Sequence, residues 1–332
     1  MHPGPRVWRR QPEAKLPAGI QITDTGRSDD APGLPLKRVI PSGPRPSPGC
    51  TLNRIGGSCL NTEDRYAEFP PPPSLAPWVK VVWTYASPEP SDTVQRIAPD
   101  GCPELILDIG APYEEEGPNG VWSLQPSALF AGQMTRPIAI RPVGPVELVA
   151  VRFHPDGARD WLGAPLNTAT DGRLDMVDRL RGVRPPAGDP EAQAKAMTDR
   201  LEALRLQQGW TVDAIVRAEV ESIIDDAPAP DRSPADQRAL QRRFLDRVGV
   251  SPRMLRSVMR FRRVFDHALE PTPEAGGWLE AGLGAGYFDQ PQMARDFRRF
   301  LGCTATEWAR EQVELARAIA SQTYKPGPPH LA

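Results

Sequence analysis

The 332-residue sequence has no apolar run long enough to cross a membrane. No stretch of 18 consecutive apolar residues occurs, whereas a membrane-spanning helix needs about 20. The N-terminus carries arginines but lacks the apolar core of a signal peptide. These absences predict a cytoplasmic protein that does not associate with membranes.

Groups suited to metal or nucleophilic chemistry are also scarce, since there are four cysteines and four histidines. The cysteines are far apart and form no zinc pattern, so we expect free thiols. Two alternatives stay open. Cys102 could act as a sensing thiol, or a metal could be held in a barrel lined by His154, Cys102, Glu104 and Asp100. No glycine-rich phosphate loop follows a strand. We therefore expect no enzyme, no catalytic residue, no cofactor and no metal.

Proline, in contrast, is abundant, with 40 residues, over twice the usual share. Residues 1–63 are rich in Pro, Gly, Arg and Asp without sustained periodicity, so we predict a disordered tail. A start codon assigned too early would give the same pattern. A second disordered tail is predicted for residues 319–332.

Residues 64–180 are predicted to form a β-rich domain. A run of apolar, β-branched and aromatic residues predicts a strand over residues 78–85, and Glu114–Glu116 is most simply a solvated loop. Proline, glycine and aspartate turns separate the further strands at intervals typical of a small barrel or sandwich. These strands are expected at residues 93–98, 104–109, 129–134, 138–141 and 146–153. A short helix is expected over residues 156–162.

The remainder is predicted to be helical, with a connector over residues 181–209 and an all-α domain over residues 210–318. Helices are expected over residues 189–207 and 211–225. Between residues 236 and 263 there are nine arginines and two acids. A local charge of about +7 in a chain of formal net charge -2 suggests a surface for phosphates.

Two amphipathic helices carry this charge. In the first, Leu240, Phe244 and Val248 recur every four residues and form an apolar stripe. In the second, Asp289 is a good N-cap, Gln292 is placed to act as a capping-box residue, and Met293 begins the buried stripe. Both helices turn arginine and glutamine side chains outward, and such side chains recognise guanine and adenine edges in a major groove.

The segments RALQRRF and VGVSP, then RFRRVF, then AGYFDQ and RDFRRFLG resemble the two helix-turn-helix units of AraC-type transcription regulators. The resemblance covers about 75 residues. Upstream, WVKVVWTY, APDGCPELILD and LVAVRFHPDGARDWLGAPL resemble the N-terminal sensor of a subgroup of that family, which is a cupin-like barrel. The implied fold class is α+β: a β-rich, barrel-like sensor followed by an all-α double helix-turn-helix domain.

The resemblance implies a sequence-specific transcription regulator. Its expected partners are double-stranded DNA, RNA polymerase and a small-molecule effector, and the oligomeric state is open between monomer and homodimer. The positions that match the family's base-reading sites are Arg238, Gln241, Arg242, Gln290, Pro291 and Arg295. Phosphate contacts are expected from Arg243, Arg247, Arg298 and Arg299.

Three features depart from the family pattern. About ten residues, three of them proline, precede the first basic helix, where a turn of 3–4 residues is usual. The first scaffold helix is therefore either residues 211–225 with a long loop or lost. The second scaffold holds four glycines, at 276, 277, 282 and 284, each costing about 1 kcal/mol in a helix, and Ala305 stands where the family usually has proline. These departures motivate an alternative, a sensor or scaffold protein whose degenerate reader binds DNA only non-specifically.

Overall fold

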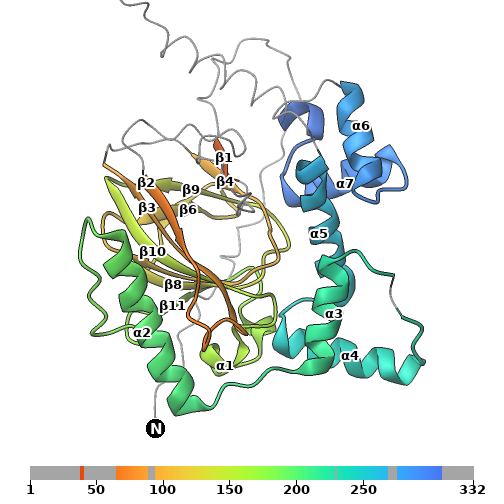
Figure 1. Ribbon diagram of the computed structural model, residues 1–332. Helices are drawn as coiled ribbons and strands as arrows, with labels where there is room; N and C mark the ends of the chain where they lie inside the picture. Colours follow the sequence, from red (N-terminus) through yellow and green to blue (C-terminus); the bar gives the residue numbers. More distant parts are fainter. Residues whose placement is uncertain (1–37, 41–64, 89–93, 229, 268–274, 309–332) are drawn as a thin grey trace, which may run out of the picture.

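The computed structural model describes residues 38–40, 65–88, 94–228, 230–267 and 275–308 (Figure 1). Its strands form a six-stranded sheet of order β11-β8-β5-β10-β3-β2 and a five-stranded sheet of order β1-β4-β9-β6-β7. The first sheet contains β2 (Arg65–Phe69), β3 (Val79–Ser87), β5 (Glu104–Asp108), β8 (Ala128–Ala131), β10 (Val146–Phe153) and β11 (Arg173–Asp175). The second contains β1 (Arg38–Ile40), β4 (Gln95–Ile97), β6 (Tyr113–Glu116), β7 (Trp122–Leu124) and β9 (Ile138–Pro142).

The central strand β10 is buried on both faces, because alternate side chains enter two different cores. Val149, Val151 and Phe153 enter the larger core. Leu148 and Ala150 point the other way and pack with Ile140 of the second sheet. The two sheets therefore face each other across a shared interior, as the predicted barrel-like domain requires.

Two expectations about the β domain are corrected. Residues 38–40 fall in the predicted disordered tail, yet they form β1, which pairs in parallel with β4. The β-branched Val39 and Ile40 suit a strand. The rest of the predicted N-terminal tail lies outside the described residues. The predicted solvated loop Glu114–Glu116 belongs to β6, where Arg141 and Arg173 pair with Glu114 and Glu115.

The larger core is closed by helices. α1 (Arg159–Leu162) is shorter than the predicted helix 156–162, and it is followed by the 3-10 turn η1 (Leu166–Thr168). α2 (Pro190–Gln208) begins at its N-cap Asp189 and lies along one side of the sheets (Figure 1). Its Met197 and Leu201 belong to the same core as the sheet. The predicted connector 181–209 is thus part of the β domain's core.

Residues 214–308, called here the helical domain, lie on the other side of the β domain (Figure 1). Its helices are α3 (Ala214–Ile224), α4 (Pro234–Arg247), α5 (Pro252–His267), α6 (Ala275–Gly284) and α7 (Gln290–Phe300), and a further turn begins at Ala305. The predicted fold class, a β-rich barrel-like domain followed by an all-α domain, is confirmed. Among the described residues, no helix combines the length and the apolar character needed to span a bilayer.

The first helical unit keeps its scaffold. Val220 and Ile223 of α3 share a core with Leu240 and Phe244 of α4, so α3 serves as the scaffold through a long loop. Glu219 of α3 is 3% exposed and accepts a hydrogen bond from Arg232 at 2.6 Å. This contact ties the proline-rich loop back onto α3, which is how a connection of this length is tolerated.

One glycine of the second unit, Gly282, lies directly against α7. A Cβ on Gly282 of α6 would lie 2.5 Å from Met293 Sδ of α7, which is closer than a real Cβ approaches. Because Met293 Sδ lies near the end of a flexible side chain, a larger residue at position 282 would require Met293 to shift. The departure at Ala305 is also compensated, because Thr304 and Glu307 form a reciprocal capping box with bonds of 2.7 and 3.2 Å.

The aromatic core of the second unit should dominate its stability. Phe261 of α5 is 1% exposed and contacts Phe265, Phe297 and Phe300. Phe261→Ala should lower the free energy of unfolding by about 3–5 kcal/mol, measured by denaturation followed through tryptophan fluorescence. Phe288→Ala is the matched control, because Phe288 is 91% exposed, and it should change stability by less than about 0.5 kcal/mol. Equal effects of the two substitutions would contradict this core.

Candidate nucleic-acid interface

α4 presents one apolar and one basic face. Ser233 caps its first turn by accepting from the N–H of Asp236 at 3.2 Å, and Pro234 stands at the first helical position. Leu240 and Phe244 are buried. The predicted base-reading residues lie on the outward side and are exposed: Arg238, Gln241 and Arg242.

α7 has the same design. Asp289 caps the helix by accepting from the N–H of Gln292 at 2.7 Å, as predicted. The amide oxygen of Gln292 returns to the N–H of Phe288 at 3.1 Å, one residue before the cap. Met293 and Phe297 are buried. The remaining predicted site residues of this helix are all exposed: Gln290, Pro291, Arg295, Arg298 and Arg299.

The guanidinium groups on these two faces differ in how they are engaged. Arg238, Arg242, Arg295 and Arg298 form no ion pair with any residue that the structure describes. Arg243 is 50% exposed and shares its charge with Asp213 at 3.0 Å. The unengaged groups are free to meet a ligand at no cost of breaking an internal pair.

Arg247 is engaged within the protein. Its guanidinium lies 2.9 Å from Asp160 of α1 and its side chain is 21% exposed. A phosphate contact by Arg247 would require this ion pair to break. In the described arrangement the side chain therefore joins the two domains, and its phosphate role stays a prediction.

Arg247 belongs to a longer seam between the domains. Near the first unit, Arg159 of α1 pairs with Asp246 of α4 at 3.1 Å, and the Thr170 hydroxyl donates to Gly249 O at 2.6 Å. Near the second unit, Arg96 of β4 donates to Leu301 O at 2.9 Å. The β domain thus contacts both helical units.

A turn of the β domain also meets α5, the helix between the units. A Cβ on Gly101 would collide with Met259 of α5, and Gly101 has a φ of +79°. Only glycine meets both requirements without strain. Gln133 donates to Gly101 O at 2.7 Å, and Asp100 accepts from the N–H of Cys102 at 2.9 Å, so the turn is fixed from inside the β domain.

Behind this turn lies a buried ion cluster. Arg152 is 6% exposed and pairs with Glu104 at 2.7 Å and with Asp100 at 3.5 Å. Trp83 donates to Glu104 at 3.1 Å. Burial by itself lowers the pKa of Arg152, but the charges of Glu104 and Asp100 outweigh it and raise the pKa. Arg152 therefore stays charged inside the β domain, next to the aromatic interior.

The groups considered for metal or thiol chemistry do not assemble into a site. His154 contacts Ala76 O at 3.2 Å, whereas Asp100 and Glu104 are bound to Arg152. No group of three or more His, Cys, Asp or Glu in the described part of the chain is arranged to hold a metal. Burial, followed by Asp100, raises the pKa of Cys102 to about 11, so its sulfur remains a thiol rather than a reactive thiolate.

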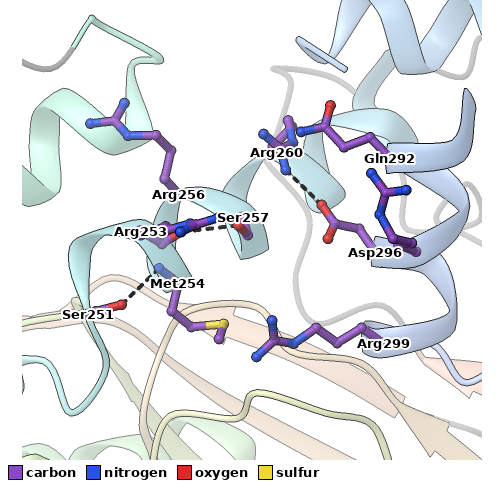
Figure 2. A pocket seen from close by; sticks show the side chains of 10 residues that line it. Ser251, Arg253, Met254, Arg256, Ser257, Arg260, Gln292, Asp296 and Arg299 are labelled. Atoms are coloured by element: carbon purple, nitrogen blue, oxygen red, sulfur yellow. Dashed lines mark hydrogen bonds and ion pairs between the residues drawn. The ribbon is translucent and has the colours of Figure 1, made fainter. Parts of the chain in front are cut away.

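A groove lies between α5 and α7 that was not predicted from the sequence. It has a volume of about 390 Å³ and is lined by Ser251, Arg253, Met254, Arg256, Ser257, Arg260, Gln292, Arg295, Asp296 and Arg299. Figure 2 shows the side chains entering it from both helices. The signal was present, since positions 253, 256, 257 and 260 follow i, i+3, i+4, i+7 spacing and share one face of a helix.

Comparison with known proteins gives limited likenesses. A model of a family described as a domain of unknown function (DUF6597) matches residues 67–175, which lie in the β domain. No curated protein matches the chain in sequence.

Among solved structures, ToxT from Vibrio cholerae O395 is 10% identical, with a TM-score of 0.38, and the match covers 69% of this chain and 96% of that one. Wild-type ToxT from Vibrio cholerae strain SCE256, with a bound unsaturated fatty acid, is 9% identical, with a TM-score of 0.36, and the match covers 77% and 96%. At these values the likeness carries no functional conclusion.

The interior of the β domain should give stability a pH dependence. Burial raises the pKa of Asp108 to about 7 from its ordinary value of 3.8, so the folded state holds a proton that the unfolded chain releases. Stability from this group is therefore highest below pH 4 and falls as pH rises to 7. Asp108→Asn should raise the free energy of unfolding at pH 8 by on the order of 3 kcal/mol, and much less at pH 4.

Denaturation at the two pH values measures this difference. Asp178→Asn is the control, since its side chain is 84% exposed, and it should change little at either pH. A loss of stability in Asp108→Asn at pH 8 would show that the ionised carboxylate has favourable partners, which contradicts the argument.

Proposed function

We propose that the chain is an AraC-type transcription regulator that binds double-stranded DNA sequence-specifically. In this proposal α4 and α7 enter successive segments of one major-groove face. Arg238, Gln241 and Arg242 read bases from α4, and Gln290, Pro291 and Arg295 read them from α7. Pro291 has no donor and offers only apolar contact. Arg243, Arg298 and Arg299 contact phosphates.

One observation carries the proposal. Two amphipathic helices, each packed on its own scaffold, present unengaged arginine and amide groups, and one helix joins them. α5 has 16 residues, so its length is about 24 Å at 1.5 Å per residue. A spacer of this size suits two recognition helices about one DNA turn, or 34 Å, apart.

The seam supports control of DNA binding by the β domain. It contacts α4 through Arg159 and Asp160, α5 through Gly101, and the end of α7 through Arg96. A small molecule that changed the interior near Arg152 would act on a turn that touches α5. We propose such an effector, with RNA polymerase as the partner in transcription and the cytoplasm as the location. Either a monomer or a homodimer is compatible with this mode of binding.

The alternative is a degenerate reader that binds DNA without sequence preference. It was motivated by the long proline-rich joint and by the glycines of α6. The joint is held by Arg232 on Glu219, and Gly282 has a packing role against Met293. These contacts support the specific reader over the degenerate one.

Selection from random DNA duplexes with the full chain tests the two. A specific regulator should enrich a bipartite motif whose halves lie about one helical turn apart. Enrichment of one half alone would mean that only one unit reads DNA. No enrichment, with binding that vanishes as salt rises, would establish the degenerate reader instead.

Arg242→Ala should cost about 1–3 kcal/mol of binding free energy on the selected duplex and relax specificity at one base pair. The side chain is exposed and forms no ion pair with a described residue, so stability should not change. Binding to a panel of single-base variants of the duplex measures the effect. Arg184→Ala, an exposed arginine of the β domain, is the matched control. A uniform loss across the panel would refute base reading by Arg242.

A further inference from the structure

The groove between α5 and α7 contains arginines of two kinds. Arg256 and Arg260 are pinned within the protein: Arg256 donates to Ala227 O at 3.0 Å, and Arg260 donates to Asp296 at 2.8 Å. Figure 2 shows Arg256 reaching away from α7 and Arg260 turned toward Asp296. These two side chains support the walls of the groove.

Arg253, Arg295 and Arg299 are different. They are exposed, and their guanidinium groups form no ion pair with any residue that the structure describes. Arg253 comes from the first turn of α5, and the other two come from α7. In Figure 2, Arg299 extends from α7 toward Met254 of α5. Three cations without an ion pair to a described residue therefore line one groove from two helices, and Arg299 also lies over the Phe300 ring, 5.4 Å from its centroid.

The single carboxylate of the groove does little to offset them. Asp296 accepts from Arg260 at 2.8 Å and from the Tyr287 hydroxyl at 3.0 Å. Arg260 also lies over the Tyr287 ring, 4.6 Å from its centroid. Because Asp296 is already paired, the net field in the groove remains positive. The hydroxyls of Ser251 and Ser257 add neutral groups along the α5 wall.

Such a groove suits an oxyanion with several acceptors. Guanidinium groups bind phosphate oxygens in a fork geometry, and an apolar ligand would find few apolar partners here. Two sources of phosphate fit this chemistry, the backbone of DNA and a free phosphate compound. The position of the groove favours DNA, because it lies between α5, which joins the two proposed reading helices, and α7, to which Arg295 and Arg299 belong.

We propose that this groove clamps the phosphates of the DNA strand that runs between the two half-sites. The inference rests on the proposed function and adds Arg253 of the joining helix to the DNA-binding residues. Within the clamp, Arg253 and Arg299 position the duplex and read no base, whereas Arg295 keeps its proposed base-reading role. The contribution of Arg253 and Arg299 to binding is therefore the same for every DNA sequence, and it depends strongly on salt.

The experiment uses the full chain, the selected duplex and a random duplex over a series of salt concentrations. Each phosphate contact contributes about 0.9 to the slope of log K against log salt. Arg253→Gln should lower that slope by about 0.9 on both duplexes and weaken binding about eightfold at 0.1 M salt. The ratio of specific to random affinity should stay unchanged. Arg184→Gln removes the same charge from the β domain and should leave the slope at the wild-type value.

Arg253→Gln should fold normally, since its guanidinium has no described partner, and thermal unfolding checks this. Arg299→Gln gives a second reading of the same groove, and the double variant should lower the slope by about 1.8. An unchanged slope in both single variants would overturn the clamp. A changed affinity ratio in Arg253→Gln would also overturn it, because that residue would then read a base.

Two further outcomes distinguish DNA from a free phosphate compound as the ligand, and failure of the clamp from failure of the proposed function. Saturable binding of inorganic pyrophosphate without DNA, lost in Arg253→Gln, would overturn the clamp in favour of a free phosphate compound. If the wild type shows no sequence preference, the proposed function fails. The slope on the random duplex still decides whether the groove contacts phosphates.

Discussion

The helical domain depends on the burial of α5 on two sides. Leu255 belongs to the core of the first unit, while Val258, Phe261 and Val264 belong to the core of the second. Helices of 10 to 16 residues are marginal in isolation, so each unit depends on the apolar face that α5 supplies. The stripe of arginines on the outer face of α5 is possible only because its inner face contributes so much apolar contact.

Electrostatics then fixes how the units sit against the β domain. Pairs between partly exposed charges contribute little each, but the seam combines them with hydrogen bonds to backbone carbonyls at Gly249 and Leu301. These bonds impose direction as well as attraction. The buried Arg152 cluster lies behind the turn that touches α5, so the most polar part of the interior is next to the seam.

Much of the architecture was predictable because it follows periodicity. The strands β3, β5, β9 and β10 follow from runs of apolar and β-branched residues between turn signals, and the helices α4 and α7 follow from apolar residues at a spacing near 3.6. The short strand β6 was missed, since three consecutive glutamates look solvated until Arg141 and Arg173 are known to lie beside them. Thr304 followed three residues later by Glu307 is the sequence signature of a capping box. It was overlooked because attention fell on Ala305, which stands where the family usually has proline.

The candidate interface was predictable only in part. The outward faces of α4 and α7 follow from each helix alone, but the engagement of Arg247 and the groove beside Arg253 arise from tertiary contacts. No local pattern tells which of nine neighbouring arginines pairs with Asp160 of a distant helix. The spacing of Arg253, Arg256 and Arg260 places them on one face of α5. The opposite wall of the groove comes from residues about 40 positions later, and the sequence does not indicate that the two lie together.

The helix α5 contributes to the cores of both units, so one continuous helix connects them. If α4 and α7 read DNA as proposed, the length of α5 sets the distance between the two reading helices. Because B-DNA turns once in about 10.5 base pairs, a single base pair inserted between two half-sites rotates the second half by about a tenth of a turn. Such a reader would distinguish targets by the spacing of their halves as well as by the bases within them.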